Sequence, residues 1–315
     1  MEKLGLVLAG GGGKGAYFIG VWKALKEFGV DKNIAAVSGT SVGALNAVLF
    51  ANGNYMEAYD IWSNITSQDI LTITPKKILS LLMRMGLPSV AIKTFGPVLM
   101  SSCLGGVFSR EGLINIIESR VNLEKVSNSY LDIYACAYNV RKLDVDYIKM
   151  NYKTDEEIKN ILLASSAIPV VFEKQNFNGQ AYYDGGLKDN VPIKPLYDEG
   201  IRNFIVIYLS RDCMIDKLKF EGANIIEIMP REDQGSLLTG TLDFSEKGAI
   251  ERINQGYKDA IRILDPIYKM GLVQHKIGDI LLDFKKDNQE FKTKRREILN
   301  EREILKNEIE NLLKR

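Results

Sequence analysis

The first fifty residues alternate between short apolar runs and segments with helical spacing, and no other feature constrains the fold of this chain as strongly. Apolar runs at residues 4–9 and 34–38 are each followed by glycine. Segments with helical spacing come next, at residues 15–28 and 41–52. Short runs with few polar positions are typical of strands that are buried on both faces of a parallel sheet. Their alternation with helices predicts an α/β fold with a parallel sheet.

The middle of the chain carries further strand and helix signals. Runs of apolar and aromatic residues at 131–138 and 143–150 predict a hairpin, and two more buried strands are expected at 204–209 and 225–229. A capping-box pattern predicts a helix over 154–164. The 315 residues are enough for one large domain or two ordinary ones.

Two regions depart from this alternation. Residues 65–108 are apolar, contain methionine and are interrupted by Pro75, Pro88 and Pro97, which predicts a cap or insertion of short helices. Most of its apolar side chains are expected to be core, and a minority to form an apolar surface over the functional site. From residue 281 onward the chain is rich in Lys, Arg and Glu and lacks Gly and Pro, so we expect a charged C-terminal helix over 281–315.

The expected C-terminal helix carries half of the apolar pattern of a coiled coil. Apolar residues recur at intervals of seven, at Phe284, Phe291, Ile298, Leu305 and Leu312. The companion position of the heptad is mostly polar, with Asn288, Arg295, Arg302 and one apolar residue, Ile309. Two interpretations stay open: a single helix with a narrow buried stripe and a solvated charged face, or a homodimer formed through this helix.

Composition excludes several classes of protein. Lys and Arg total 41 against 40 Asp and Glu, so the net charge of +1 gives no general attraction to nucleic acid or to an anionic membrane. The three cysteines form no CxxC pair, so neither a disulfide framework nor a structural zinc site is expected. The single histidine, His275, excludes a His-rich metal site. We expect His275 to be partly exposed and without a role, and any hydrolytic chemistry to take its base elsewhere.

No segment for targeting or membrane insertion is visible. Residues 1–9 are too short for a signal peptide, and no apolar run reaches the length of a membrane span. The sequence therefore predicts a soluble, cytoplasmic protein.

A cluster of glycines, Gly10 to Gly13 with Lys14 and Gly15, follows the first expected strand. Gly10, Gly12 and Gly15 fit the fingerprint of dinucleotide-binding folds, but the second strand does not end in the acidic residue that would hold a ribose. A phosphate-binding P-loop is excluded because Lys14 is followed by glycine rather than by Ser or Thr. Four consecutive glycines exceed the needs of a tight turn. A non-catalytic protein that binds an anion or a nucleotide stays open as an alternative.

The segment from Gly39 to Gly43 has the GxSxG pattern of a nucleophile elbow, with Ser41 at its centre. Such a serine stands on a sharp turn between a strand and a helix, where the helix N-terminus favours developing negative charge. An ordinary N-cap serine is the alternative. Adjacent parallel strands would bring this turn beside the glycine cluster, so that the N–H groups of Gly11 to Gly13 form an oxyanion hole facing Ser41.

Asp184, which Gly185 and Gly186 follow, is the strongest candidate for a base. It is expected at the end of a strand, and its two small neighbours leave room around its carboxylate. Partial burial would raise the pKa of this carboxyl group and make it a usable proton acceptor. An ordinary Asp-Gly turn is the alternative.

In this order, the three motifs resemble those of the patatin-like phospholipase family, in its bacterial form. That family combines a glycine-rich oxyanion loop of the form GGGx(K/R)G, a GxSxG serine and a DGG or DGA aspartate. The matching segments here are residues 10–15, 39–43 and 184–186. The similarity covers residues 3–209, and the chain beyond residue 210 is not explained by the family's motifs.

The resemblance implies a dyad of Ser41 and Asp184 on a three-layer α/β/α sandwich with a mainly parallel sheet, in a domain over residues 1–280. It implies a lipid acyl hydrolase, of the phospholipase A or lysophospholipase type, that works through an acyl-enzyme without metal or cofactor. Its partners would be phospholipids or other acyl-ester lipids, met in transient contact with a membrane surface. A hydrolase of small esters or thioesters on the same fold is the alternative.

Three positions bear on the substrate site that the resemblance implies. Lys14 matches the basic position of the glycine loop, where it would orient the loop or meet a lipid phosphate; a plain surface lysine is the alternative. Ala9 and Val170 depart from the family's pattern, in which Asp and Gly are frequent at the respective positions. These departures put the shape of the substrate pocket in question.

Overall fold

A computed structural model describes the chain at residues 3–65, 72–73, 108–109, 111–169, 171–235, 240–241 and 243–313. The chain divides into two compact units, Met1–Ile263 and Leu264–Arg315. The helical cap expected over 65–108 lies outside the described residues, apart from Ile65 and a short antiparallel pair formed by β3 (Thr72–Ile73) and β4 (Phe108–Ser109). Val170 lies outside them as well.

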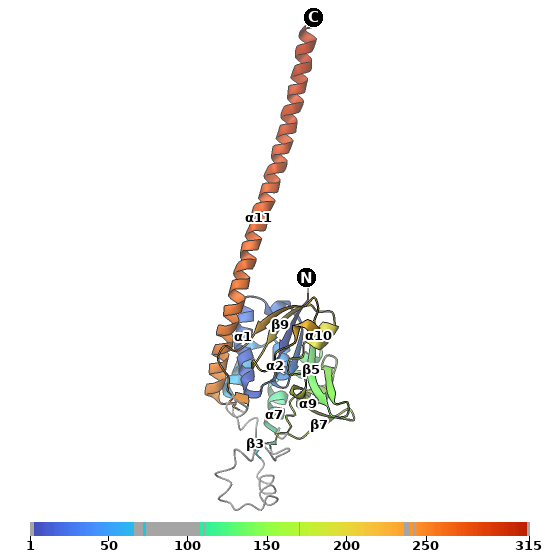
Figure 1. Ribbon diagram of the computed structural model, residues 1–315, viewed down its shortest axis with the longest axis vertical. Helices are drawn as coiled ribbons and strands as arrows, with labels where there is room; N and C mark the ends of the chain where they lie inside the picture. The colour runs from blue at the N-terminus through green and yellow to red at the C-terminus, as the bar shows by residue number, and fades with distance from the viewer. Residues whose placement is uncertain are drawn as a thin grey trace, which may run out of the picture. The chain divides into compact units, whose positions relative to one another are not determined.

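The first unit is built on an 8-stranded sheet with the order β10-β9-β1-β2-β5-β8-β7, in which β6 also pairs with β5 (Figure 1). The parallel strands are β1 (Leu4–Leu8), β2 (Ile34–Thr40), β5 (Asp132–Asn139), β9 (Asn203–Ile207) and β10 (Asn224–Ile228). The antiparallel strands are β6 (Asp144–Lys149), β7 (Gln175–Phe177) and β8 (Gln180–Asp184). The predicted mainly parallel sheet and the predicted hairpin, β5–β6, are confirmed.

Helices cover both faces of this sheet. A Cβ at Gly39 of β2 would touch the backbone of Gly43 in α2 (Val42–Asn52), so Gly39 faces α2. A Cβ at Gly5 of β1 would lie 3.1 Å from the Leu196 side chain in α10 (Lys194–Asp198), so Gly5 faces α10. Gly39 pairs with Leu8, and Leu8 stands three residues from Gly5 on β1. Because side chains alternate along a strand, α2 and α10 lie on opposite faces, and the predicted three-layer arrangement is confirmed.

Among its described residues, the first unit contains five further helices ahead of α11. They are α1 (Ala16–Glu27), α3 (Tyr55–Asn64), α7 (Glu111–Arg120), α8 (Leu123–Ser127) and α9 (Asp155–Ser165). The capping box predicted for α9 is present, because the Thr154 hydroxyl accepts from the Glu157 N–H and the Glu157 carboxylate accepts from the Thr154 N–H. Within the described residues, no helix is both long and apolar enough to cross a membrane.

The last helix, α11 (Glu246–Leu313), belongs to both units. Its first part packs against the rest of the first unit, and Ala249, Ile253 and Ala260 are buried there. There the hydroxyl group of Tyr17 in α1 donates a hydrogen bond to the Asp259 carboxylate at 3.1 Å. The charged helix expected from residue 281 is therefore the last part of a longer helix.

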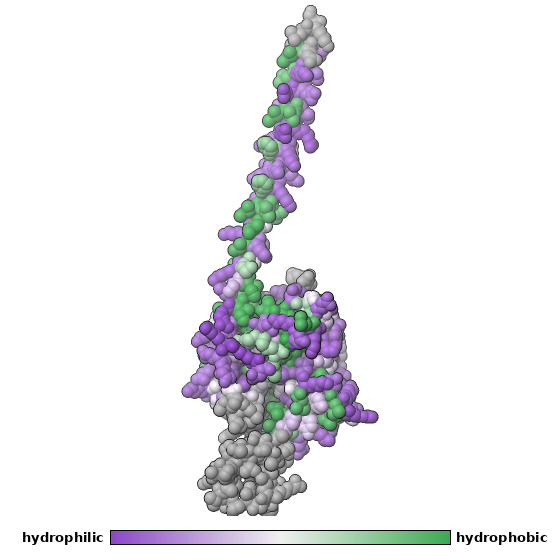
Figure 2. All heavy atoms as spheres, viewed as in Figure 1, coloured by the Kyte–Doolittle hydropathy of each residue, from purple (hydrophilic) through white to green (hydrophobic). Residues whose placement is uncertain are grey.

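The second unit is a single stretch of α11. Phe284, Phe291, Ile298 and Leu305, which recur at intervals of seven, are 58% to 66% exposed, and Figure 2 shows apolar side chains at intervals along this helix. Within this unit no other segment covers the stripe.

Candidate active site

Ser41 stands at the turn between β2 and α2, as the sequence predicted. Its backbone has φ 56° and ψ −123°, a combination that residues other than glycine seldom adopt. This strained turn is typical of a nucleophile elbow, and it puts the serine at the N-terminus of α2. Close packing accompanies the turn, since a Cβ at Gly43 would lie 2.2 Å from the Leu8 carbonyl oxygen.

Asp184 lies next to Ser41 because the C-terminal ends of β2 and β8 meet on the same edge of β5. The first part of β5 pairs with both β2 and β6, and its last part pairs with both β8 and β6. β2 and β8 therefore share the edge that β6 leaves free. Thr40 of β2 pairs with Cys136, and Asp184 pairs with Ala137, the next residue along β5. Ser41 and Asp184 are consequently neighbours.

The carboxyl group of Asp184 is held in a buried position, with the residue 5% exposed. Burial raises its pKa from 3.8 to about 6. Hydrogen bonds from the Ser41 hydroxyl and from the Gly186 N–H, the second at 2.8 Å, lower the pKa and offset part of the effect of burial. The rise in pKa expected from the sequence is present. A carboxyl group with this pKa is largely ionised at pH 7 and can accept a proton.

The glycine cluster follows β1 and forms the short helix η1 (Gly12–Gly15). The Gly10 N–H donates to the Asn190 carbonyl at 3.1 Å. The N–H groups of Gly11 and Gly12, by contrast, have no acceptor among the described residues. Gly12 has a φ of +55°, and a Cβ there would lie 2.1 Å from the Thr241 carbonyl oxygen, so no other residue fits. Unpaired N–H groups beside a nucleophile are what an oxyanion hole requires.

The segment that follows Asp184 ties the glycine cluster to the strand of the serine. The Asn190 side chain donates to the Gly10 carbonyl at 3.2 Å, which reciprocates the bond from the Gly10 N–H. The hydroxyl group of Thr40, the residue before Ser41, donates to the Asp189 carbonyl at 2.9 Å. The short segment of Asp189 and Asn190, which follows the Asp184 motif, is thus hydrogen-bonded to both the glycine cluster and the strand that precedes Ser41.

Ser165, at the end of α9, supports the turn of Ser41 from the other side. Its hydroxyl oxygen accepts a hydrogen bond from the Ser41 N–H at 2.9 Å, and the hydroxyl donates to the Cys136 carbonyl at 2.7 Å. The sequence motifs assign a role to neither Ser165 nor Asn190. The signal for each is a polar residue in a segment that flanks one of the motifs.

The three motifs open onto one cleft of about 530 Å³. Of the residues singled out in the sequence, those that line it are Gly10, Gly11, Gly12, Lys14, Ser41, Asp184 and Gly186. The others do not line it and pack the backbone around it: Gly13, Gly15, Gly39, Gly43 and Gly185. Of the three glycines predicted for an oxyanion hole, Gly11 and Gly12 thus border the cleft and Gly13 does not.

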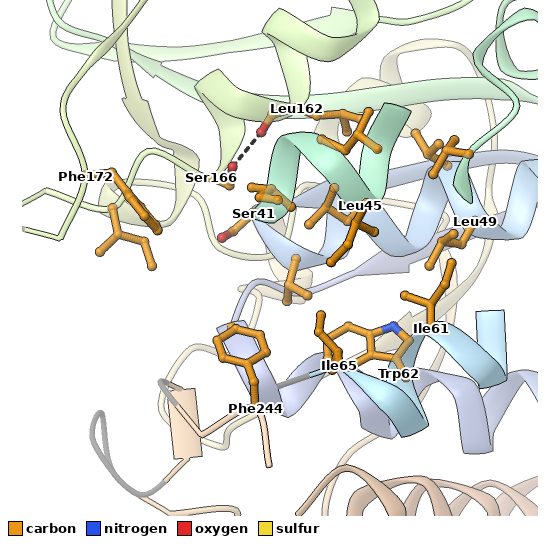
Figure 3. Close-up of a pocket in the computed structure, with 18 residues that line it drawn as sticks. Ser41, Leu45, Leu49, Ile61, Trp62, Ile65, Leu162, Ser166, Phe172 and Phe244 are labelled. Carbon is orange, nitrogen blue, oxygen red and sulfur yellow. Dashed lines mark hydrogen bonds between the residues drawn. The ribbon is translucent and has the colours of Figure 1, made fainter. Parts of the chain in front are cut away.

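A second pocket, almost entirely apolar, begins at the same serine (Figure 3). Leu45 and Leu49 of α2 point into it, as do Ile61 and Trp62 of α3. Ser41 borders both the apolar pocket and the cleft. The pocket is small, about 70 Å³, and its apolar lining suits a hydrocarbon segment whose polar end lies at Ser41.

Two further residues singled out in the sequence, Lys14 and His275, differ in their exposure. Lys14 is 8% exposed and lines the cleft, so the alternative of a plain surface lysine is wrong. His275 belongs to the second unit, where it is exposed and its Nδ1 lies 3.1 Å from the Asp279 carboxylate.

Comparison with known proteins finds a matching family model and several similar proteins. The family model of patatin-like phospholipases matches residues 6–197. A probable lipid hydrolase, 463L, of Invertebrate iridescent virus 6 is 28% identical over 199 residues, which are 60% of this chain and 61% of the viral protein. Lysophospholipase NTE1 of Cryptococcus neoformans is 27% identical over 206 residues, which are 65% of this chain and 11% of the fungal protein. The chain thus corresponds to only part of the length of these relatives.

Among solved structures, VipD from Legionella pneumophila and the type III effector protein ExoU are similar to this chain. Their TM-scores are 0.46 and 0.44, at 17% and 16% sequence identity. The matches cover 84% and 85% of this chain, and 67% and 54% of the two proteins.

Proposed function

Because the chain belongs to the patatin-like phospholipase family, we propose that it is a lipid acyl hydrolase with Ser41 as nucleophile and Asp184 as base. The observation that carries the proposal is that Ser41 borders both the cleft that contains Asp184 and the apolar pocket. An acyl chain in the apolar pocket would present its ester carbonyl to the Ser41 hydroxyl. The rest of the lipid would then occupy the cleft.

In the first half of the proposed reaction, the oxygen of the Ser41 hydroxyl attacks the ester carbonyl while Asp184 accepts the hydroxyl proton. The tetrahedral intermediate carries a negative oxygen, which accepts hydrogen bonds from the Gly11 and Gly12 N–H groups. A single donor of this kind accelerates acyl transfer by about 10²- to 10³-fold. Collapse of the intermediate transfers the proton from Asp184 to the departing alcohol and leaves an acyl-enzyme.

In the second half, water attacks the acyl-enzyme and Asp184 accepts a proton from that water. The second tetrahedral intermediate releases the fatty acid, and the proton returns from Asp184 to the Ser41 oxygen. These steps use one carboxylate as acid and base in turn, and they require no metal or cofactor.

Lysophospholipids are the proposed substrate class. The curated fungal relative is named a lysophospholipase, and the apolar pocket beside Ser41 suits an acyl chain. Lys14 adds a cation on the cleft, where the phosphate of a lysophospholipid would lie. Such substrates come from membranes, so a transient contact with a membrane surface is part of the proposal.

Covalent labelling by a fluorophosphonate, which reacts with activated serines, tests the nucleophile. We expect the wild-type chain to be labelled, Ser41→Ala to be unlabelled and Asp184→Asn to be labelled slowly, because the base no longer removes the Ser41 proton. His275→Ala is the control, since it replaces the only histidine, and it should be labelled like the wild type.

Two results would count against this proposal. Labelling of Ser41→Ala would mean that another residue is the nucleophile. An unlabelled wild-type chain that binds a nucleotide saturably would favour a binding protein without catalytic activity. A series of acyl chain lengths, measured with oxygen esters and thioesters, separates a lipid hydrolase from a small-ester or thioester hydrolase.

Lys14→Met tests the contact with phosphate. For lysophosphatidylcholine we expect kcat/KM to fall by about 10- to 100-fold, because a charge-assisted hydrogen bond to phosphate is lost. For a monoacylglycerol with the same acyl chain, which has no phosphate, kcat/KM should change by less than about 3-fold. Equal losses on the two substrates would instead assign Lys14 to orienting the glycine loop.

A further inference from the structure

The second unit presents a long apolar stripe, which we define as Met270, Ile277, Phe284, Phe291, Ile298 and Leu305. Each of these side chains is more than half exposed. The second unit is a single helix, so no other segment of it covers them, and Figure 2 shows apolar side chains at intervals along the helix. Exposed apolar side chains in such number mark an interaction surface.

The strict spacing of the stripe identifies the shape of its partner. An α-helix has 3.6 residues per turn, so residues spaced by seven drift by about 20° per heptad. Between Met270 and Leu305 the stripe therefore winds through about 100° around a straight helix. A flat membrane surface cannot follow such a winding, whereas a second helix supercoiled around the first keeps contact throughout.

The polar residues of the unit also disfavour a membrane. Acidic and basic residues occur in nearly equal numbers from residue 264 to the end of the chain. Helices that lie on anionic membranes carry a predominantly basic polar face and a broad apolar one. Here the charges of the polar residues have mixed sign, which is typical of a coiled coil.

We propose that the second unit forms a parallel, two-stranded coiled coil with a second copy of this chain. With the stripe at heptad position d, position a holds Ile267, Gln274, Leu281, Asn288, Arg295, Arg302 and Ile309. An asparagine at position a selects two strands and fixes their register. Arginines at position a extend their charged ends into water from a two-stranded interface, but a bundle of three or four helices would enclose them.

The charges beside the stripe select the parallel orientation. In a parallel pair, position g faces position e of the next heptad in the partner. Asp287 then faces the partner's Lys292, and Glu301 faces the partner's Lys306. In an antiparallel pair position e faces position e, which would oppose lysines from the set Lys285, Lys292 and Lys306. In an antiparallel pair position g also faces position g, where Lys294 can meet Asp287 or Glu301, so the lysines at position e carry the preference for the parallel arrangement.

The oligomeric state of the full chain, measured by sedimentation equilibrium, tests the proposal. We expect a dimer. The double substitution Phe284→Glu and Phe291→Glu should raise its dissociation constant by at least about 100-fold, because two buried rings are replaced by charges. The matched control is Leu282→Glu with Ile304→Glu, two similarly exposed apolar residues outside positions a and d, and it should remain a dimer.

Disulfide crosslinking tests the orientation in a chain that carries Cys103→Ser and Cys213→Ser. Leu281→Cys and Arg302→Cys, made separately at position a, should each crosslink to themselves under mild oxidation. In an antiparallel pair only a residue at the midpoint meets its own copy, so at most one of the two variants would crosslink.

Three results would overturn the proposal. The first is a wild-type chain that is monomeric at high micromolar concentration. The second is a dimer that survives Phe284→Glu with Phe291→Glu. The third is a monomeric chain that binds phosphatidylserine vesicles and loses that binding in Phe284→Glu, which would assign the stripe to a membrane. Ester hydrolysis is not involved in any of these measurements, so the outcome is independent of the proposed enzymatic function.

Discussion

Replacing Asp184 with asparagine should lower kcat for lipid hydrolysis by about 10³- to 10⁴-fold with little change in KM. The amide has nearly the same size and keeps an oxygen that can accept the hydrogen bond from the Gly186 N–H. It cannot accept the proton of the Ser41 hydroxyl, so only the chemical steps become slower. Steady-state kinetics on a lysophospholipid at pH 8 measure the effect. A loss smaller than about tenfold would assign the base to another residue.

Two comparisons make this result specific. Residues that act as a unit give strongly non-additive losses, so Ser41→Ala with Asp184→Asn should lose no more activity than Ser41→Ala alone. For the wild type, kcat/KM should fall about tenfold per pH unit below pH 6, because protonated Asp184 cannot accept the Ser41 proton and its pKa is about 6. The residual activity of Asp184→Asn should lack this dependence.

The raised pKa of Asp184 also lowers the free energy of unfolding at neutral pH. Burial raises the pKa of Asp184 from 3.8 in the unfolded chain to about 6 in the folded one, so the folded protein binds this proton more tightly. Ionisation therefore opposes folding: the penalty is absent below pH 4, develops between pH 4 and 6, and reaches up to about 3 kcal/mol at pH 7. Asp184→Asn removes the penalty and should be more stable than the wild type at pH 7. A stable but inactive variant also excludes misfolding as the cause of its inactivity.

The parts of the site that depend on local pattern could be predicted from the sequence. An apolar run, a glycine turn and a helix identify β1 with the glycine cluster and β2 with Ser41, because each piece lies within a short stretch of chain. Parallel pairing of β1 with β2 then follows from the general rules for α/β folds. Asp184 could be picked out because two glycines mark the end of its strand.

The meeting of Ser41 with Asp184 could not be predicted in this way. It depends on the last residues of β5 pairing with β8, while the first ones pair with β2 on the same edge. β7 is only 3 residues long, and two of them, Gln175 and Asn176, are polar, so it has no apolar alternation. The local signal for this hairpin is the Asn178–Gly179 turn, in which both residues have positive φ.

The burial of Lys14 could not be predicted from the sequence either. A lysine among glycines is expected to be exposed, since lysine is seldom buried. Here a segment distant in the sequence covers it, and a Cβ at Gly240 would lie 2.6 Å from the Lys14 Cε. The contact depends on how Gly240, Thr241 and Asp243 return to the glycine cluster, and no local pattern specifies that path.

Replacing Gly43 with alanine should destabilise the first unit by at least about 2 kcal/mol, in the opposite direction from helix propensity. Alanine in a helix interior is favoured over glycine by about 1 kcal/mol. At Gly43, however, the added Cβ would lie 2.2 Å from the Leu8 carbonyl oxygen and 2.8 Å from that of Ala9. Both are backbone atoms, so α2 and β1 must move apart. Thermal and urea unfolding of the wild type and the variant measure the change.

Gly271→Ala provides the matched control for Gly43→Ala. Gly271 is also in a helix, but a Cβ there meets nothing within 4 Å, so this substitution should be neutral or stabilising. Separation of α2 from β1 would also move Ser41 away from the Gly11 and Gly12 N–H groups. A misplacement of about 1 Å costs about 100-fold in rate, so the folded fraction of Gly43→Ala should lose activity by at least that factor. If Gly43→Ala matched Gly271→Ala in stability and the wild type in activity, the glycine would not be needed for close packing, and the geometry of the elbow would have to rest on Ser41 and Ser165 alone.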